Sequence, residues 1–246
     1  MKSLVKKLLF PGVNLHARCR YHEIPRLFRS DLPENANVLD AGCGNGMLSF
    51  QAWKLGATVL GVSIKQKEVD GCRAMFNSGK GIPEDKLRFE NLNLYDMVPE
   101  QHQFDAILCT EVLEHIRDDV GVCRKFFELL KPGGTLHVTS PNADHPYNVA
   151  FPLDLEEQGG HVRPGYTQQS YRDLLEPLGF EVLQFVGLGG PIRQGFNHRI
   201  KEIQARCGAW SGVPLFLLSL PFLPFDSREP KVPFSIYVKA RKPSAS

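Results

Sequence analysis

Short runs of apolar and β-branched residues alternate along most of the chain with segments long enough to form helices. The runs predict strands at residues 37–40, 58–62, 86–91, 104–109 and 135–139, with helices at 46–55, 67–77 and 118–130. Farther on we expect a helix at 168–178, a strand at 180–186 and a last edge strand at 234–240. Because strands that alternate with helices usually pair in parallel, the pattern predicts an α/β fold, a three-layer sandwich.

The length of 246 residues suits one domain with an elaboration. We expect an N-terminal arm and helix over residues 1–35 and a main domain over 36–246, with an insertion at about 187–233. The arm, the loop at 141–167 and the insertion are the variable parts, and surface loops commonly carry specificity. We therefore expect substrate selection to reside there.

Composition narrows the class of protein. Hydrophobic residues make up 42% and charged residues 23% of the chain, which excludes a disordered tail, a collagen and a coiled coil. The net charge of +2, without a block of like charges, argues against a dedicated nucleic-acid surface. Six scattered cysteines without paired CxxC spacing indicate reduced thiols. Since residues 1–10 lack the apolar core of an export signal, we expect a cytoplasmic protein.

A glycine-rich loop, VLDAGCGNG, follows the first predicted strand. Glycines at 42, 44 and 46 allow the backbone to turn tightly and to approach a ligand at the start of the next helix. A dinucleotide site would require glycine where Met47 stands and an acid where Ser63 closes the second strand. These two departures exclude the dinucleotide interpretation.

The loop resembles the first motif of class I S-adenosylmethionine-dependent methyltransferases, and the resemblance continues through FDAILCTEVLEHI and LKPGGTLHVTSPN. It covers roughly residues 36–186. The resemblance implies a Rossmann-like fold with a mostly parallel, seven-stranded sheet and an antiparallel last strand. It also implies an enzyme that uses S-adenosylmethionine as cofactor.

Positions that match the family's motif can be named individually. Asp40 and the loop backbone would hold the methionine part of the cofactor, and Asn93 would lie beside the adenine, with Ile64 and Leu94 flanking the ring. The family usually places an acid on the ribose where this chain has Ser63, which leaves open which group holds the ribose. The residues that we expect at the cofactor are Asp40, Gly42, Cys43, Gly44, Gly46, Ser63, Ile64, Asn93, Leu94 and Thr110.

The segment after the fourth strand bears on the methylated atom. Cys109–Val112 stands where amide and exocyclic-amine methylases carry an NPPY-type sequence, so a hydroxyl on a small organic molecule is the favoured acceptor. Methylation of carbon or nitrogen, and a protein that binds the cofactor without catalysis, stay open as alternatives. A hydroxyl attacks poorly unless a base takes its proton or a metal lowers its pKa.

Three histidines are candidates for that chemistry. His161 lies between glycines and a proline turn, where no regular core requires an imidazole, and His145 follows the fifth strand closely. His115 belongs to the TEVLEH string, which family members with different chemistries share, so a structural hydrogen bond is the favoured explanation for it. We expect His161, His115 and His145 as the catalytic candidates.

A divalent metal site is a further hypothesis. Glu111, Glu114 and His115 are spaced so that one helical turn would place them on one face, and His161 could close the site. These side chains suit Mg²⁺, Mn²⁺ or Zn²⁺. A similar ExxEH followed by a later histidine holds the metal in small-RNA 2′-O-methyltransferases, but this chain lacks their basic face, so RNA is a remote alternative. Otherwise the carboxylates serve local structure and His161 acts alone as base.

An apolar segment at residues 213–225, broken by three prolines, is too short to span a bilayer. We favour core or subunit contact for it. With the basic arm MKSLVKKLLF it could instead face a lipid-like substrate or a membrane surface, and a resemblance to quinone-pathway O-methyltransferases would then suggest an isoprenoid substrate. The oligomeric state and the substrate's identity stay open.

Overall fold

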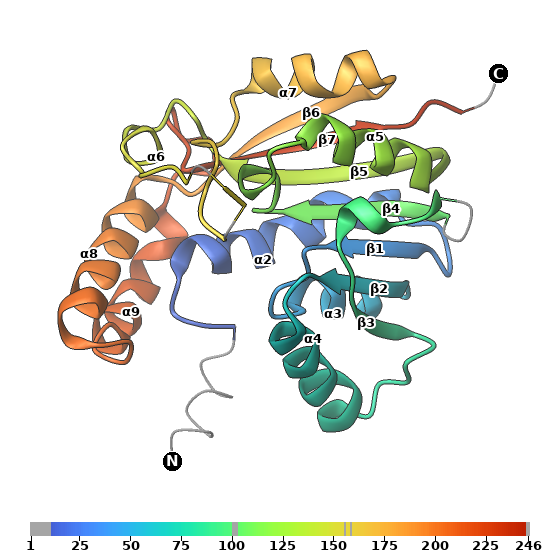
Figure 1. The fold of residues 1–246 in the computed structure, drawn as a ribbon. Coiled ribbons are helices and arrows are strands. Elements are labelled where there is room, and N and C mark those ends of the chain that lie inside the picture. The colour runs from blue at the N-terminus through green and yellow to red at the C-terminus, as the bar shows by residue number, and fades with distance from the viewer. Residues whose placement is uncertain (1–10, 100–102, 155, 158, 245–246) are drawn as a thin grey trace.

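A seven-stranded sheet in the order β3-β2-β1-β4-β5-β7-β6 forms the centre of the computed structural model (Figure 1). The structure describes residues 11–99, 103–154, 156–157 and 159–244. The strands are β1 (Asn37–Ala41), β2 (Thr58–Ser63), β3 (Leu87–Asn91), β4 (Phe104–Thr110), β5 (Leu130–Pro141), β6 (Glu181–Leu188) and β7 (Ser235–Arg241).

Helices cover both faces of the sheet. The α-helices of the described residues are α2 (Leu15–Phe28), α3 (Met47–Lys54), α4 (Gln66–Cys72), α5 (Asp119–Leu129), α6 (Pro146–Val149), α7 (Gln168–Leu175), α8 (Pro191–Cys207) and α9 (Val213–Ser219), of which α8 and α9 lie beside the sheet (Figure 1). Successive residues of β1 point to opposite faces. Val38 packs in the cluster that contains Ile24 of α2 and Ala52 of α3, whereas Leu39 packs with Phe126 of α5. The predicted three-layer α/β sandwich is therefore confirmed.

The last strand departs from the prediction in one respect. β7 runs antiparallel, as expected, but it pairs with both β5 and β6, so β6 rather than β7 forms the edge. The alternation of polar residues in β7 suggested an exposed strand. Lys239 instead forms an ion pair with Asp31 at 2.6 Å, so its charge is satisfied without an open sheet edge.

The segment between β6 and β7 forms a helical lobe beside the sheet. Its helix α8 packs on α2, and Ile200, Leu15 and Phe216 form a small separate core. Phe216 is buried as the favoured interpretation of residues 213–225 requires, but the opposite side of the segment is exposed. No helix in the described part of the chain is long and apolar enough to cross a membrane. The basic arm at 1–10 lies outside the described residues, and the predicted boundary at residue 35 stays a prediction.

Candidate cofactor cavity and active site

The three glycines of the loop after β1 all adopt positive φ angles, each for a different local reason. At Gly42 an added Cβ would lie 2.4 Å from Val112, and at Gly46 it would lie 2.8 Å from Phe76. At Gly44 the nearest atom would be the Gly42 carbonyl oxygen at 4.0 Å. Gly44 therefore exposes its backbone to open space, as close approach of a ligand requires.

That open space is a cavity of about 350 Å³ at the carboxyl ends of β1, β2 and β4. Ligands of open α/β sheets bind at this edge. The cavity is lined by nine of the ten residues expected at the cofactor, namely Asp40, Gly42, Cys43, Gly44, Ser63, Ile64, Asn93, Leu94 and Thr110. Gly46 does not line it and instead caps the N-terminus of α3.

Asp40 is a buried carboxyl at the end of the cavity formed by the glycine loop. Its Oδ2 accepts a hydrogen bond from Ser49 Oγ at 2.5 Å. Burial raises the pKa of Asp40 to about 6, although the Ser49 hydrogen bond acts in the opposite direction. A cation placed beside Asp40 would thus relieve an unfavourable buried charge.

A carboxylate does lie near the end of β2, although Ser63 itself is not acidic. Ser63 Oγ donates to Glu68 Oε2 at 2.7 Å, and both residues line the cavity. Glu68 comes from the first turn of α4. The sequence analysis did not identify Glu68. Its position five residues after Ser63, in an expected helix, could have indicated an acid near the end of β2.

Arg20 and Glu111 form an ion pair on another wall of the cavity, with 3.1 Å between Arg20 Nη1 and Glu111 Oε2. Glu111 has a φ of 55°, a conformation that is uncommon for a residue other than glycine. Thr139 Oγ1 also donates to it at 3.3 Å. The sequence could not predict Arg20 as a residue of this site, because no local pattern indicates that α2 packs near the end of β4.

The predicted helical turn that would align Glu111 with Glu114 and His115 is wrong. Only Leu113–His115 form a short 3₁₀ turn, and the positive φ of Glu111 places it before that turn. Because Glu111 is engaged by Arg20, it does not join the other candidate metal ligands.

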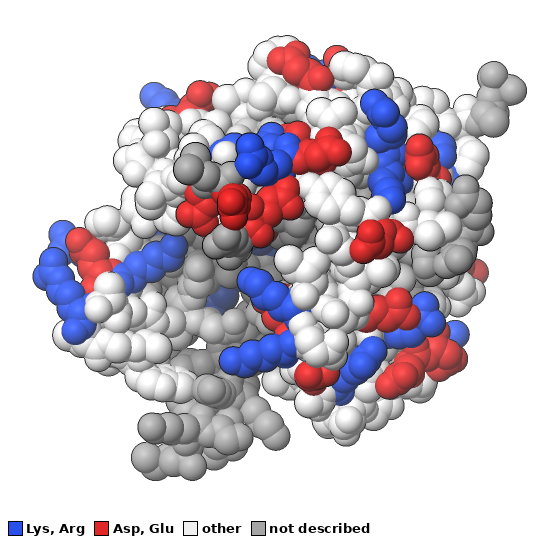
Figure 2. Space-filling model, viewed as in Figure 1, with Lys and Arg blue, Asp and Glu red and all other residues white. Residues whose placement is uncertain are grey.

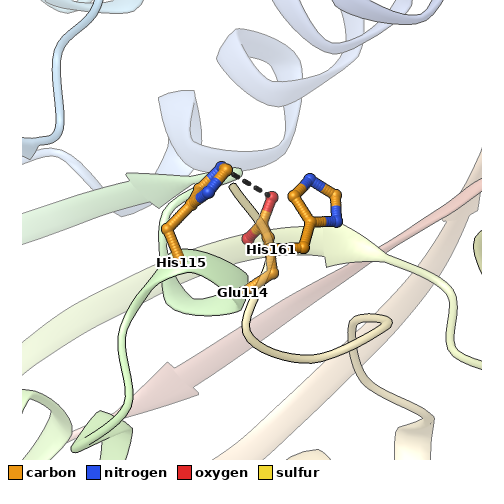
Figure 3. A group of neighbouring side chains, drawn as sticks. All are labelled: Glu114, His115 and His161. Carbon is orange, nitrogen blue, oxygen red and sulfur yellow. Dashed lines mark ion pairs between the residues drawn. The ribbon is translucent and has the colours of Figure 1, made fainter. Parts of the chain in front are cut away.

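Glu114, His115 and His161 do come together, with ligand atoms within 4.8 Å of one another. Figure 3 shows the Glu114 carboxyl between the two imidazole rings. Glu114 is buried, and its Oε2 has no hydrogen-bond partner among the described residues. Burial and the nearby Glu111 raise the pKa of Glu114 well above its usual value, whereas burial lowers the pKa of His161.

A hydrogen bond to the backbone fixes the ring orientation of His115. Its Nδ1 lies 2.8 Å from the Gly160 carbonyl oxygen, which can only accept, so Nδ1 carries the proton. In the neutral ring Nε2 then keeps a lone pair, and it lies 3.9 Å from Glu114 Oε1. His115 also lines the cofactor cavity, so it connects the cavity with this cluster.

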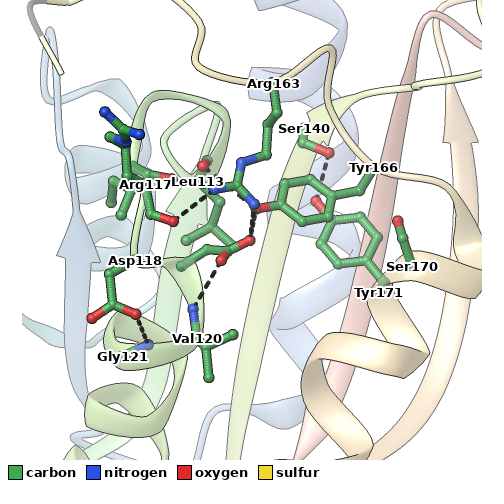
Figure 4. Close-up of polar contacts among 12 residues, drawn as sticks. Leu113, Arg117, Asp118, Val120, Gly121, Ser140, Arg163, Tyr166, Ser170 and Tyr171 are labelled. Atoms are coloured by element: carbon green, nitrogen blue, oxygen red, sulfur yellow. Dashed lines mark hydrogen bonds and ion pairs between the residues drawn. The ribbon is translucent and has the colours of Figure 1, made fainter. Parts of the chain in front are cut away.

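The loop that carries His161 is held against α5 by a partly buried polar network (Figure 4). Asp119 accepts from Arg163 and, at 2.5 Å, from the Tyr166 hydroxyl. Arg163 Nη2 donates to the carbonyl oxygens of Ile116 and Arg117, at 2.7 and 2.9 Å. These contacts bring the loop back to the segment after β4, where His161 meets Glu114.

His145 lies elsewhere. It caps the N-terminus of α6, and its Nε2 is 3.1 Å from Gln194 Oε1. It lines a second cavity that shares no lining residue with the first. The structure therefore brings together two of the three catalytic candidates, His115 and His161, and separates the third.

The molecule is hollowed between the α8–α9 lobe and the α4 side of the sheet (Figure 2). Lysine and arginine side chains gather on the flanks of this hollow, and acidic side chains gather above it, over the loop between α6 and α7. The strand order, the antiparallel β7 and the glycine loop at the sheet edge define a class I S-adenosylmethionine-dependent methyltransferase fold. Comparison with known proteins agrees with this class.

Residues 14–185 match the family described as a methyltransferase domain, and the chain belongs to that family. It is 33% identical over 146 residues to a ubiquinone biosynthesis O-methyltransferase of Xanthomonas axonopodis pv. citri (strain 306), which is 59% of each chain. With the enzyme of the same name from Xanthomonas campestris pv. campestris (strain B100), identity is 34% over 143 residues, 58% of this chain and 57% of the relative. The match thus spans less than two thirds of these curated relatives.

Solved structures share the fold at low sequence identity. Magnesium protoporphyrin IX methyltransferase from Synechocystis PCC 6803, with bound S-adenosylhomocysteine, has a TM-score of 0.63 at 15% identity, covering 94% of this chain and 85% of its own. The [4+2]-cyclase SpnF has a TM-score of 0.65 at 19% identity, covering 91% and 82%. At these identities the likeness shows the fold alone.

Proposed function

We propose that the chain transfers the methyl group of S-adenosylmethionine to a hydroxyl of a small organic molecule. The observation that carries the proposal is the position of His115, which lines the cofactor-sized cavity and also belongs to the cluster with Glu114 and His161. His115 thus joins the proposed cofactor site to the proposed acid–base cluster. The O-methyltransferase names of the curated relatives favour oxygen as the acceptor.

The residues of the cavity fit the cofactor. Asp40 would face the ammonium of the methionine part, beside the exposed backbone at Gly44. Glu68, fixed by Ser63, would accept the ribose hydroxyls in place of the missing acid at the end of β2. Ile64, a 65% exposed apolar side chain on the rim, would gain cover from the adenine.

The cofactor supplies an electrophilic methyl group on a sulfonium, so the protein has to align an oxygen in line with it and exclude water. As the new carbon–oxygen bond forms, the carbon–sulfur bond breaks and the hydroxyl proton must leave. A neutral His161 imidazole is suited to accept that proton. S-adenosylhomocysteine leaves as the second product.

Glu114, His115 and His161 would also fit a divalent metal. Of the three metals expected from the sequence, two imidazoles and one carboxylate suit Mn²⁺ or Zn²⁺ better than Mg²⁺, which prefers oxygen ligands. The unpartnered Glu114 Oε2 and the backbone-held His115 ring support this arrangement. When bound, such a metal would lower the pKa of the substrate hydroxyl. Glu111 is not part of this proposal, because Arg20 engages it.

A label-transfer assay tests the proposal. Protein incubated with methyl-labelled cofactor and a metabolite extract should transfer label to a small molecule through a base-stable ether bond. Label on carbon or nitrogen would show the wrong acceptor atom, and tight cofactor binding without transfer would indicate a non-catalytic cofactor-binding protein. Full turnover in chelator would exclude the metal and leave His161 as base. Unimpaired turnover by His161→Ala would exclude both roles of that histidine.

We propose a lipid-like acceptor because apolar side chains are exposed along α9 and the 3₁₀ turn that follows it, at residues 220–225. Leu217, Leu218 and Phe225 are 52%, 60% and 80% exposed. Such a ridge could rest on a membrane surface. Flotation of the full chain with liposomes, but not of a chain lacking residues 1–10 and carrying serine at these three positions, would support peripheral contact. Equal flotation of both would refute it. A cytoplasmic location stays part of the proposal.

A further inference from the structure

Four large apolar side chains are exposed within seven consecutive residues between β5 and α7. They belong to Tyr147, Val149, Phe151 and Leu153, which are between 38% and 62% exposed and which we call the 147–153 strip. The seven residues include no charged side chain. Single exposed apolar residues are ordinary, but a group of them usually marks a surface that binds something apolar. The strip therefore indicates a binding surface separate from the ridge at α9.

Hydrogen bonds on its inner side hold the strip in place. Asn148 is buried, and its Nδ2 donates to the carbonyl oxygens of Asn142 and Phe234, at 2.9 and 3.0 Å. At the far end, the Asp154 backbone N–H donates to the His161 carbonyl oxygen at 2.7 Å. Because both ends are fixed in this way, binding a ligand on the strip does not carry the entropic cost of ordering a loose loop.

The strip touches the proposed methyl-transfer cluster. The ring centroids of Phe151 and His161 lie 4.7 Å apart. The His161 ring also lies 4.8 Å from the ring of His115, which lines the cofactor cavity. The part of a substrate that adjoins a hydroxyl placed at His161 would therefore meet Phe151.

The strip also contacts the helical lobe. The Tyr147 ring lies 5.9 Å from the His198 ring of α8 and 6.0 Å from the Phe234 ring, and Figure 1 shows α6 beside α8. Helix α8 packs against α9, which carries the exposed apolar ridge. The strip thus runs between the methyl-transfer cluster and the lobe that we propose to rest on a membrane surface.

Acidic residues border the strip. Asp154, Glu156 and Glu157 follow it directly, and Figure 2 shows acidic side chains over the loop between α6 and α7. Negative charge there repels an anionic ligand but has little effect on an uncharged one. A neutral hydrocarbon is therefore the occupant that this surface favours.

We infer that the 147–153 strip binds the hydrocarbon chain of the methyl acceptor, beginning at Phe151 beside His161. The inference rests on the proposed function, because it assigns a place to one part of the proposed lipid-like acceptor. A chain laid along the strip covers apolar surface that is otherwise in contact with water. The affinity for an acceptor thus depends on the length of its chain.

Binding to protein saturated with S-adenosylhomocysteine tests the inference without turnover. Equilibrium dialysis measures the affinities of phenol, 4-ethylphenol, 4-butylphenol and 4-hexylphenol. A fully buried CH₂ group strengthens binding about fourfold, so on a half-exposed strip we expect about twofold for each CH₂ group. Val149→Ser combined with Leu153→Ser should remove most of this gain with chain length. The matched control, Leu217→Ser combined with Leu218→Ser, removes two exposed apolar side chains from α9 and should keep the gain.

The inference is overturned if affinity does not rise with chain length, if the strip variant keeps the gain, or if the control variant loses it. A dimer in sedimentation that the strip variant dissociates, with the gain unchanged, would assign the strip to a second copy of the chain and also overturn the inference. Failure of the proposed function looks different. In that case the gain and its loss in the strip variant would persist, while the label-transfer assay detects no methylated product.

Discussion

Glu68 offers the sharpest test of the proposed cofactor site, because we propose that it accepts the ribose hydroxyls in place of an acid at the end of β2. Its Oε2 accepts from Ser63 at 2.7 Å, and Lys65 Nζ lies 3.8 Å from its Oε1. The side chain is 35% exposed, so a charge-assisted bond there should contribute near the lower end of its range. We expect Glu68→Gln to weaken S-adenosylhomocysteine binding by about 2 kcal/mol, or about 30-fold. Ser63→Ala should cost about 1 kcal/mol, or about fivefold.

Calorimetric titration of the purified variants measures these changes. A 2′-deoxyribose analogue of S-adenosylhomocysteine makes the assay specific, since it lacks one hydroxyl that Glu68 is proposed to accept. The parent protein should prefer the natural ligand, and Glu68→Gln should lose most of that preference. Asp70→Asn, an exposed acid on the same helix, serves as the control. Equal weakening of both ligands by Glu68→Gln would refute ribose recognition and indicate an indirect structural effect.

Three further predictions concern the loop, its acid and the His161 loop. Gly44→Ala should weaken S-adenosylhomocysteine binding at least tenfold. Gly81→Ala is the control, because Gly81 also has a positive φ and open space for a Cβ, and it should leave binding unchanged. Equal affinities of the two variants in calorimetry would contradict this. Burial raises the pKa of Asp40 to about 6, so protonation below that pH should remove its attraction for the ammonium of the cofactor. The affinity for S-adenosylhomocysteine should therefore be about tenfold weaker at pH 5 than at pH 7. An affinity that does not change with pH would contradict the pairing. Tyr166→Phe leaves Asp119 one donor short and should lower the free energy of unfolding by about 1–3 kcal/mol in urea titrations; an unchanged midpoint and slope would show that the network does not stabilise the fold.

The cofactor cavity was largely predictable because its determinants are local. Each glycine of the loop marks a positive φ, and the ligand contacts expected there come from backbone or from residues directly after a strand. The carboxyl ends of parallel strands meet at one edge, so knowing where β1, β2 and β4 end was enough to bring Asp40, Ser63 and Thr110 together. Local pattern could not reveal Arg20, because it reaches the cavity from α2, whose packing depends on distant contacts.

The predicted metal ligands also show that local sequence cannot report long-range contacts. The spacing of Glu111, Glu114 and His115 allows a shared helical face, but spacing cannot report the backbone angle that Glu111 adopts. Arg20, from α2, engages Glu111 and leaves only the other two residues with His161. His161 in turn depends on the hydrogen bond from the Val162 backbone to the Glu114 carbonyl oxygen at 2.8 Å, which joins segments 48 residues apart. The residue types therefore indicate which chemistry is available, while long-range contacts decide which of those residues can carry it out.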